Sequence, residues 1–192
     1  MKRLNLLGLV IGAAILFSGC AKEDFSPPGS DPADQATPSL KAAKKATSFT
    51  GVCIPTDIPG DPGILKPLPN GKALLRGFMS VWYDDATDPL VTGQTTWYAK
   101  EKDEADGSFT YWGKAELLVD EDLGKWDMSW KGNGGPVLNE AGDVIGLDLV
   151  AYVVGQGKEG AVKGLVAKWT YTMHWDFAVP ETFVYNITGS YH

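Results

Sequence analysis

The sequence predicts an all-β fold, namely an antiparallel eight-stranded barrel preceded by a signal peptide and a flexible tether. From Ser48 onward, apolar and polar residues alternate with the period of two that is typical of a half-buried strand. Short turn-forming segments separate these runs, and none of them shows the 3.6-residue apolar stripe of an amphipathic helix. Since an open sheet of eight strands would expose two edges, we expect closure into a barrel.

The expected strands follow one another along the whole C-terminal part of the chain. They lie near 48–54, 72–84, 91–101, 108–119, 124–131, 143–154, 162–175 and 182–191. The sequence between them is rich in Gly, Asp and Asn, as in GNGGPVLNEAG (132–142) and GQGKEG (155–160), which favours turns. A proline-rich stretch at 55–69 is expected to be a loop.

Alternation also assigns the faces of the strands. Trp126, Met128 and Trp130 share one face, as do Phe183, Tyr185 and Ile187, and we expect these faces to form the core. The strand near 162–175 has a third such face, made by Leu165, Ala167, Trp169, Tyr171, Met173 and Trp175.

Some strands carry apolar residues on both faces. Segment 144–154 is apolar on both faces, and three other strands hold two adjacent aromatic residues, which point to opposite faces. Exposed apolar patches need cover. The cover expected here is either the proline-rich loop 55–69 or a second copy of the chain, so a homo-oligomer is one prediction.

The N-terminus predicts an address in the cell envelope. Lys2 and Arg3 precede an apolar run of about 14 residues, which is too short to span a bilayer but fits a signal peptide. Phe17-Ser18-Gly19-Cys20 resembles a bacterial lipobox, and this resemblance implies cleavage before Cys20 and acylation of Cys20 with palmitate-type chains. The expected organisation is a signal peptide at 1–19, a lipidated and proline-rich tether at 20–46, and the barrel at 47–192.

The residues after the cysteine refine the location. Ala21 departs from the Asp that resembles an inner-membrane retention signal, which favours an outer-membrane lipoprotein of a Gram-negative bacterium. Lys22-Glu23-Asp24 is similar to the short acidic export signal of surface lipoproteins in one large phylum of such bacteria. The alternative is that these three charges simply begin a solvated tether.

Composition excludes some functions. The net charge is −7 and no cluster of Lys and Arg stands out in the sequence, so nucleic-acid binding is not expected. With Cys20 acylated, Cys53 has no partner for an intrachain disulfide and is expected to be a small core residue.

The glycine-rich segment GQGKEG spells G-x-G-x-x-G, but the residues after it favour a strand rather than the helix that a dinucleotide site needs. With Ala161 and Gly164, this hairpin resembles that of allene-oxide-cyclase-like and dirigent-like barrels. The resemblance implies eight strands, frequent trimers and a hydrophobic small molecule inside. The catalytic residues of that family cannot be placed on this chain.

The sequence contains no catalytic signature, and its catalytic residues stay unknown. His174 and His192 are too far apart in sequence to suggest a zinc motif, so neither a metal nor a cofactor is expected. Asp84, Asp85 and Asp88 are expected in solvated turns.

Two charges lie within apolar runs. Arg76 lies between Leu74 and Phe78, and Asp148 lies within GLDLV. Either both face solvent, or they form the polar part of an apolar pocket. The second alternative gives a candidate ligand pocket made of Arg76, Trp82, Asp148 and Tyr152.

The leading hypothesis is a lipid-anchored barrel that binds a small hydrophobic ligand. Two alternatives stay open: a cyclase- or isomerase-type enzyme that acts inside the barrel, and a surface module that stacks a glycan on outward-facing aromatic residues.

Overall fold

The computed structural model describes residues 45–192. The predicted signal peptide, Cys20 and nearly all of the predicted tether lie outside the described residues. The described part contains strands, turns and short 3₁₀ helices and no α-helix, and within it no helix is long and apolar enough to span a membrane.

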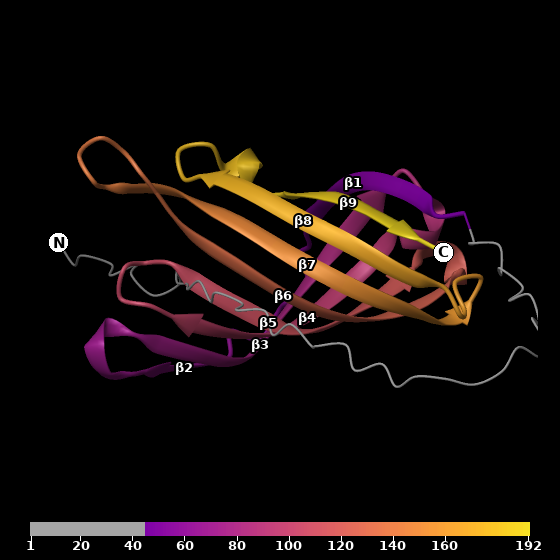
Figure 1. Cartoon of the computed structure of the whole chain (residues 1–192), viewed down its shortest axis with the longest axis horizontal. Helices are drawn as coiled ribbons and strands as arrows, with labels where there is room; N and C mark the ends of the chain where they lie inside the picture. The colour runs from indigo at the N-terminus through magenta and orange to yellow at the C-terminus, as the bar shows by residue number, and fades with distance from the viewer. Residues whose placement is uncertain (1–44) are drawn as a thin grey trace, which may run out of the picture.

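The fold is a single antiparallel sheet that closes on itself (Figure 1). Its strands are β1 (Thr47–Pro55), β2 (Ile64–Pro67), β3 (Ala73–Ala86), β4 (Gly93–Asp103), β5 (Phe109–Val119), β6 (Gly124–Leu138), β7 (Val144–Gly160), β8 (Val166–Asp176) and β9 (Tyr185–Tyr191). The 3₁₀ helices are η1 (Pro69–Gly71), η2 (Pro89–Val91), η3 (Asp120–Asp122) and η4 (Pro180–Thr182). Strand β1 pairs with both β9 and β3, which closes β1 and β3–β9 into a ring of eight. The predicted all-β barrel is confirmed.

Two details of the prediction were wrong. The proline-rich loop contains the short strand β2, which pairs with the first part of β3 and makes nine strands in total. Strands β6 and β7 also continue through the glycine-rich segments that we expected to be turns. The reason is steric: several of these glycines face inward and leave room for aromatic rings, as at Gly155, where an added Cβ would lie 2.4 Å from the ring of Trp169.

One end of the barrel is filled. Trp126 packs edge to face on Trp169 with ring centroids 5.4 Å apart, and Phe49 packs on the same Trp169 at 5.6 Å. Val162, from the turn between β7 and β8, is fully buried against this cluster. The prediction that Trp126, Met128 and Trp130 belong to the core is confirmed, and so is the buried position of Cys53.

The other end is wider. Strand β1 pairs only with the second half of β3, at Trp82–Ala86, so the first half of β3 leaves the ring and carries β2 on its free edge. In Figure 1, β2 and the β6–β7 hairpin diverge toward this end, whereas the C-terminus lies near the opposite, filled end. We call the wider end the mouth.

The outer wall is largely polar. On β7, Tyr152 and Val154 are exposed, but their cross-strand neighbours on β6 and β8 are Lys131, Thr170, Ser129 and Lys168. The stretch 55–69 lies at the edge of β3, with Ile64 and Leu65 exposed, and therefore does not cover β7. That a second copy of the chain covers the outer face of β7 stays a prediction.

Candidate functional site: an aromatic cavity at the mouth

A cavity of about 170 Å³ opens at the mouth, above the packed core. Ten of its seventeen lining residues are aromatic, and the lining includes no Lys, Arg or His. The aromatic residues are Phe78, Trp82, Trp97, Phe109, Tyr111, Trp130, Tyr171, Trp175, Phe183 and Tyr185. A dry apolar cavity of about 150 Å³ is known to admit benzene. The volume therefore suits a ligand of about one ring with a few substituents.

The aromatic rings hold one another in edge-to-face contacts. Trp97 packs against Trp130 with ring centroids 5.2 Å apart and against Tyr171 at 5.1 Å. Phe183 follows η4 and packs on Trp175 at 4.6 Å and on Trp82 at 5.3 Å, so it joins β8 to β3 at the mouth. Such contacts favour a fixed arrangement of ring faces and edges around the open space.

Glycines on β6 make room for two of these rings. A Cβ on Gly132 would lie 2.7 Å from the ring of Tyr111, and a Cβ on Gly134 would lie 2.6 Å from the ring of Phe109. Both glycines face the interior, where ordinary side chains would push the rings of β5 into the cavity. The segment KGNGG therefore shapes the site.

One carboxyl group lines the cavity. Glu101 on β4 lies directly opposite Tyr111 on β5 and faces inward. Burial raises the pKa of Glu101 to about 7, and the nearby carboxylate of Asp103 adds to the shift. Asp103 is 5 % exposed and its pKa is also raised by burial. Glu101 therefore changes charge near neutral pH.

Several polar atoms of residues that line the cavity or lie near Glu101 have no hydrogen-bond partner within the described chain. These are Tyr111 Oη, Trp130 Nε1 and Asp103 Oδ1, all of them buried. The hydroxyl of Tyr185 is close enough to Tyr111 for the two groups to affect each other's pKa, but the pair does not meet full hydrogen-bond geometry. Buried polar groups are nearly always paired in proteins, so unpaired ones at a cavity favour a bound molecule.

Beneath the cavity lies a buried polar cluster. Asp84 Oδ2 accepts hydrogen bonds from Tyr171 Oη at 2.8 Å and Thr95 Oγ1 at 2.7 Å. Burial raises the pKa of Asp84, and burial followed by the charge of Asp84 raises the pKa of the neighbouring Cys53 thiol. Our expectation that Asp84 lies in a solvated turn was wrong, because β3 continues to Ala86 and turns Asp84 into the barrel. Asp85, by contrast, is exposed.

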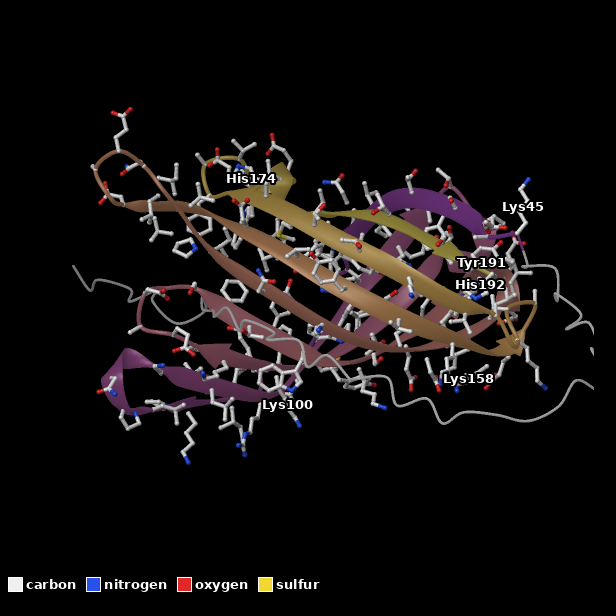
Figure 2. The ribbon with its side chains drawn as sticks, in the orientation of Figure 1. Lys45, Lys100, Lys158, His174, Tyr191 and His192 are labelled. Atoms are coloured by element: carbon white, nitrogen blue, oxygen red, sulfur yellow. The ribbon has the colours of Figure 1, made fainter. Side chains whose placement is uncertain are left out.

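The predicted pocket residues do not come together. Trp82 lines the cavity, whereas Arg76, Asp148 and Tyr152 are exposed on the outer wall. Asp148 bonds there to the ring of His174, with Oδ1 and Nδ1 2.7 Å apart. Figure 2 shows His174 on the outside of the barrel.

For Arg76, the reason is a β-bulge. The register of β3 against β4 shifts between Arg76 and Phe78, and Gly77 has a φ of 74°. The extra residue reverses the alternation, so Leu75 faces inward before the bulge and Phe78 after it. Sequence analysis missed Glu101. Residues four apart on a strand lie on the same face, so the inward-facing Trp97 could have indicated that Glu101 also faces inward.

The described side chains include no group of three or more His, Cys, Asp or Glu placed to hold a metal ion. Comparisons with protein-family models, with curated proteins and with solved structures found no match. The fold and the cavity therefore identify the class of protein only as an all-β barrel with an aromatic cavity at one end.

Proposed function

We propose that this protein is a lipid-anchored envelope protein whose barrel binds a small hydrophobic ligand at the mouth. The observation that carries the proposal is the cavity lined by ten aromatic residues. Most binding sites for small molecules are concave and apolar with a few polar groups, and this cavity has that composition. The lipobox-like Cys20 supports the anchor.

Nuclear magnetic resonance tests the binding. A chain that begins at Ala21, and therefore lacks the predicted lipidation site Cys20, is titrated with tert-butylbenzene while the indole N–H signals are followed. Signals of Trp97 and Trp130 should shift, whereas the signal of Trp126, which is enclosed at the filled end, should not. The variant Ala99→Leu, which fills the cavity, should abolish the shifts. Unshifted signals of Trp97 and Trp130 would contradict the proposal.

The anchor has a separate test. The full chain and its Cys20→Ser variant are expressed in a Gram-negative host supplied with labelled palmitate. We expect label and membrane association for the parent chain and neither for the variant. A variant that stays in the membrane fraction would show that another segment holds the protein there.

An isomerase-type enzyme is the second candidate, and one observation favours it. A carboxyl group with a pKa of about 7, opposite a buried tyrosine hydroxyl, is suited to proton transfer at neutral pH. The test is deuterium exchange at the acidic carbon of 2-tetralone in heavy water. Exchange faster than buffer that disappears in Glu101→Gln would support an enzyme, and exchange equal to buffer would count against it.

A further inference from the structure

The mouth cavity contains acidic groups without a matching cation. Glu101 lines it, and Asp103 lies close enough to raise the pKa of Glu101. Neither carboxyl belongs to any salt bridge found in the described part of the chain, and Asp103 Oδ1 has no hydrogen-bond partner there. Burying a carboxylate without a counter-charge is costly, so the site lacks a positive group.

The protein's own cations do not supply the positive group that the cavity lacks. Lys100 and Lys102 flank Glu101 in sequence and therefore point to the outer side of β4. Figure 2 shows Lys100 on the outside of the barrel. Lys102 pairs with Glu104, which also pairs with Lys72. A positive charge in the cavity would have to come from a ligand.

The aromatic lining suits such a charge. The faces of Trp and Tyr rings attract ammonium groups, most strongly where water is excluded. Trp82, Trp97 and Trp175 are only half-buried in the protein and border the open space. An acidic ligand, in contrast, would meet the carboxyl group of Glu101, with Asp103 near it, and no lysine, arginine or histidine in the lining.

We propose that the cavity selects ligands carrying an amine or quaternary ammonium group over neutral or acidic ligands of the same shape. This inference rests on the proposed function, since it names the ligand class of the same cavity. Glu101 forms the ion pair, Tyr111 Oη lies on the same polar side of the cavity, and Asp103 adds negative charge near Glu101. The aromatic rings surround the apolar part of the ligand.

Ionisation of Glu101 links this binding to pH. The titratable groups that face Glu101 are Asp103 on its own strand, Tyr111 on β5 and Tyr185 on β9, while β3 contributes Leu75 and Ser80. The tyrosines stay neutral, since burial raises the pKa of both. Affinity for a cation should therefore rise between pH 6 and pH 8, as Glu101 loses its proton.

The experiment compares two probes of nearly equal shape, phenyltrimethylammonium and tert-butylbenzene. Their binding to the chain that begins at Ala21 is measured by tryptophan fluorescence. At pH 8 the cation should bind at least tenfold more tightly than the neutral probe. Glu101→Gln should remove that preference and its pH dependence. Glu116→Gln, which changes a carboxylate on the outer wall, should keep both.

The outcomes separate the two proposals. Equal binding of both probes, or an unchanged preference in Glu101→Gln, would overturn the selection for cations and leave the hydrophobic cavity function standing. Failure of both probes to bind would overturn the cavity function and this inference with it.

A second inference concerns the outer wall and rests on different residues. Two neighbouring cross-strand rows run around β3–β8 without a single acidic residue, although the protein has a net charge of −7. One row is Arg76, Lys100, Trp112, Lys131, Tyr152 and Thr170, and the other is Met79, Tyr98, Lys114, Ser129, Val154 and Lys168. We call these two rows the basic belt.

The belt brings cations and aromatic residues next to one another on neighbouring strands. All five of its Lys and Arg side chains are exposed, as are Tyr98 and Tyr152, and Trp112 is half-exposed. Since neighbouring strands lie about 4.8 Å apart, the first five residues of the first row span about 19 Å. Aromatic faces stack on sugar rings, and the cations complement acidic groups repeated along a chain.

We infer that the basic belt binds an acidic polysaccharide. A flexible polymer can follow the curved wall across six strands, whereas a flat membrane surface would meet only some of them. The residues of the belt are separate from the cavity, so this inference does not depend on ligand binding at the mouth.

Calorimetry with polygalacturonate, with neutral dextran as control, tests the belt on the chain that begins at Ala21. We expect binding to polygalacturonate alone, weakened at least tenfold by Lys100→Glu with Lys114→Glu and also by Tyr152→Ser. Lys158→Glu, an exposed change outside the belt (Figure 2), should bind like the parent. Absence of polygalacturonate binding, or binding only to phosphatidylglycerol vesicles, would overturn the inference.

Discussion

The hydroxyl of Tyr171 donates a 2.8 Å hydrogen bond to Oδ2 of Asp84 across the inside of the barrel. The two residues lie on β8 and β3, which are not neighbours in the sheet because β9 and β1 lie between them. Both are fully buried or nearly so, at 1 % and 0 % exposure. This bond therefore connects opposite parts of the wall beneath the cavity.

Removing the Tyr171 hydroxyl should destabilise the fold. Tyr171→Phe leaves Asp84, a buried acceptor, with one donor fewer, which should lower the free energy of unfolding by about 1–3 kcal/mol. Urea denaturation of a chain that begins at Ala21 measures this. The matched control is Tyr83→Phe, which removes a hydroxyl that bonds Asp120 at the surface, and there we expect a change within about 0.5 kcal/mol. Equal losses in both variants would show that the buried bond has no special role.

Glu101 should make stability depend on pH. Its pKa is raised in the folded state, so the folded protein binds more protons than the unfolded one between about pH 4.5 and 7. Stability from this group is therefore lost as pH rises through that interval, by at most about 3 kcal/mol. Glu101→Gln should be more stable than the parent at pH 8 and show no such gain at pH 4. A constant difference between the two proteins at both pH values would contradict the raised pKa.

Two adjacent glycines on β6 should respond differently to substitution. Gly134→Ala brings a Cβ to 2.6 Å from the ring of Phe109, whereas the nearest atom to a Cβ on Gly135 is the Ser108 side chain at 3.6 Å. We expect Gly134→Ala to cost about 1–3 kcal/mol and Gly135→Ala to be nearly neutral. Thermal unfolding compares the two, and equal costs would show that β6 does not approach β5 as described.

The two core tryptophans of β6 should also differ. Trp126 is fully buried and its Nε1 donates a 2.7 Å hydrogen bond to the carbonyl oxygen of Leu90, whereas Trp130 borders the cavity and its Nε1 has no partner among the described residues. Truncation of either to Ala should cost on the order of 3–5 kcal/mol. We expect Trp126→Ala to be the more destabilising of the two, measured by urea denaturation. A larger loss at Trp130 would place the packed core at the mouth instead.

Alternation predicted the fold class because it follows directly from the geometry of a strand. It placed Trp126 and Trp130 correctly, and it would have placed Glu101 if extended from Trp97 along β4. It failed at Arg76, since the bulge at Gly77 reverses inside and outside within one strand. A bulge depends on how two strands pair, and this information is not local to the sequence.

The glycine-rich segments show a second limit. In Gly132 and Gly134, glycine lies within a strand because the rings of Tyr111 and Phe109 occupy the space where side chains would be. Glycine is also typical of turns, so whether a glycine indicates a turn or a strand depends on its partners on another strand. The cavity could not be predicted for this reason: its volume results from aromatic residues on one strand facing glycines on the next.

The last prediction concerns self-association through the tip of the β6–β7 hairpin. Leu138, Val144 and Ile145 are 55 %, 49 % and 42 % exposed there. Phe177 donates its backbone N–H to the Ile145 carbonyl oxygen and is itself 44 % exposed. These four apolar side chains are exposed at the rim of the mouth, and soluble monomers usually avoid extended exposed apolar surface. We therefore expect a chain that begins at Ala21 to associate at tens of micromolar in light scattering, and Val144→Ser with Ile145→Ser to shift it toward the monomer. Tyr152→Ser, on the basic belt, is the control and should leave the association unchanged. A parent chain that is monomeric at this concentration would reject the prediction, and association lost only in Tyr152→Ser would place the interface on the belt instead.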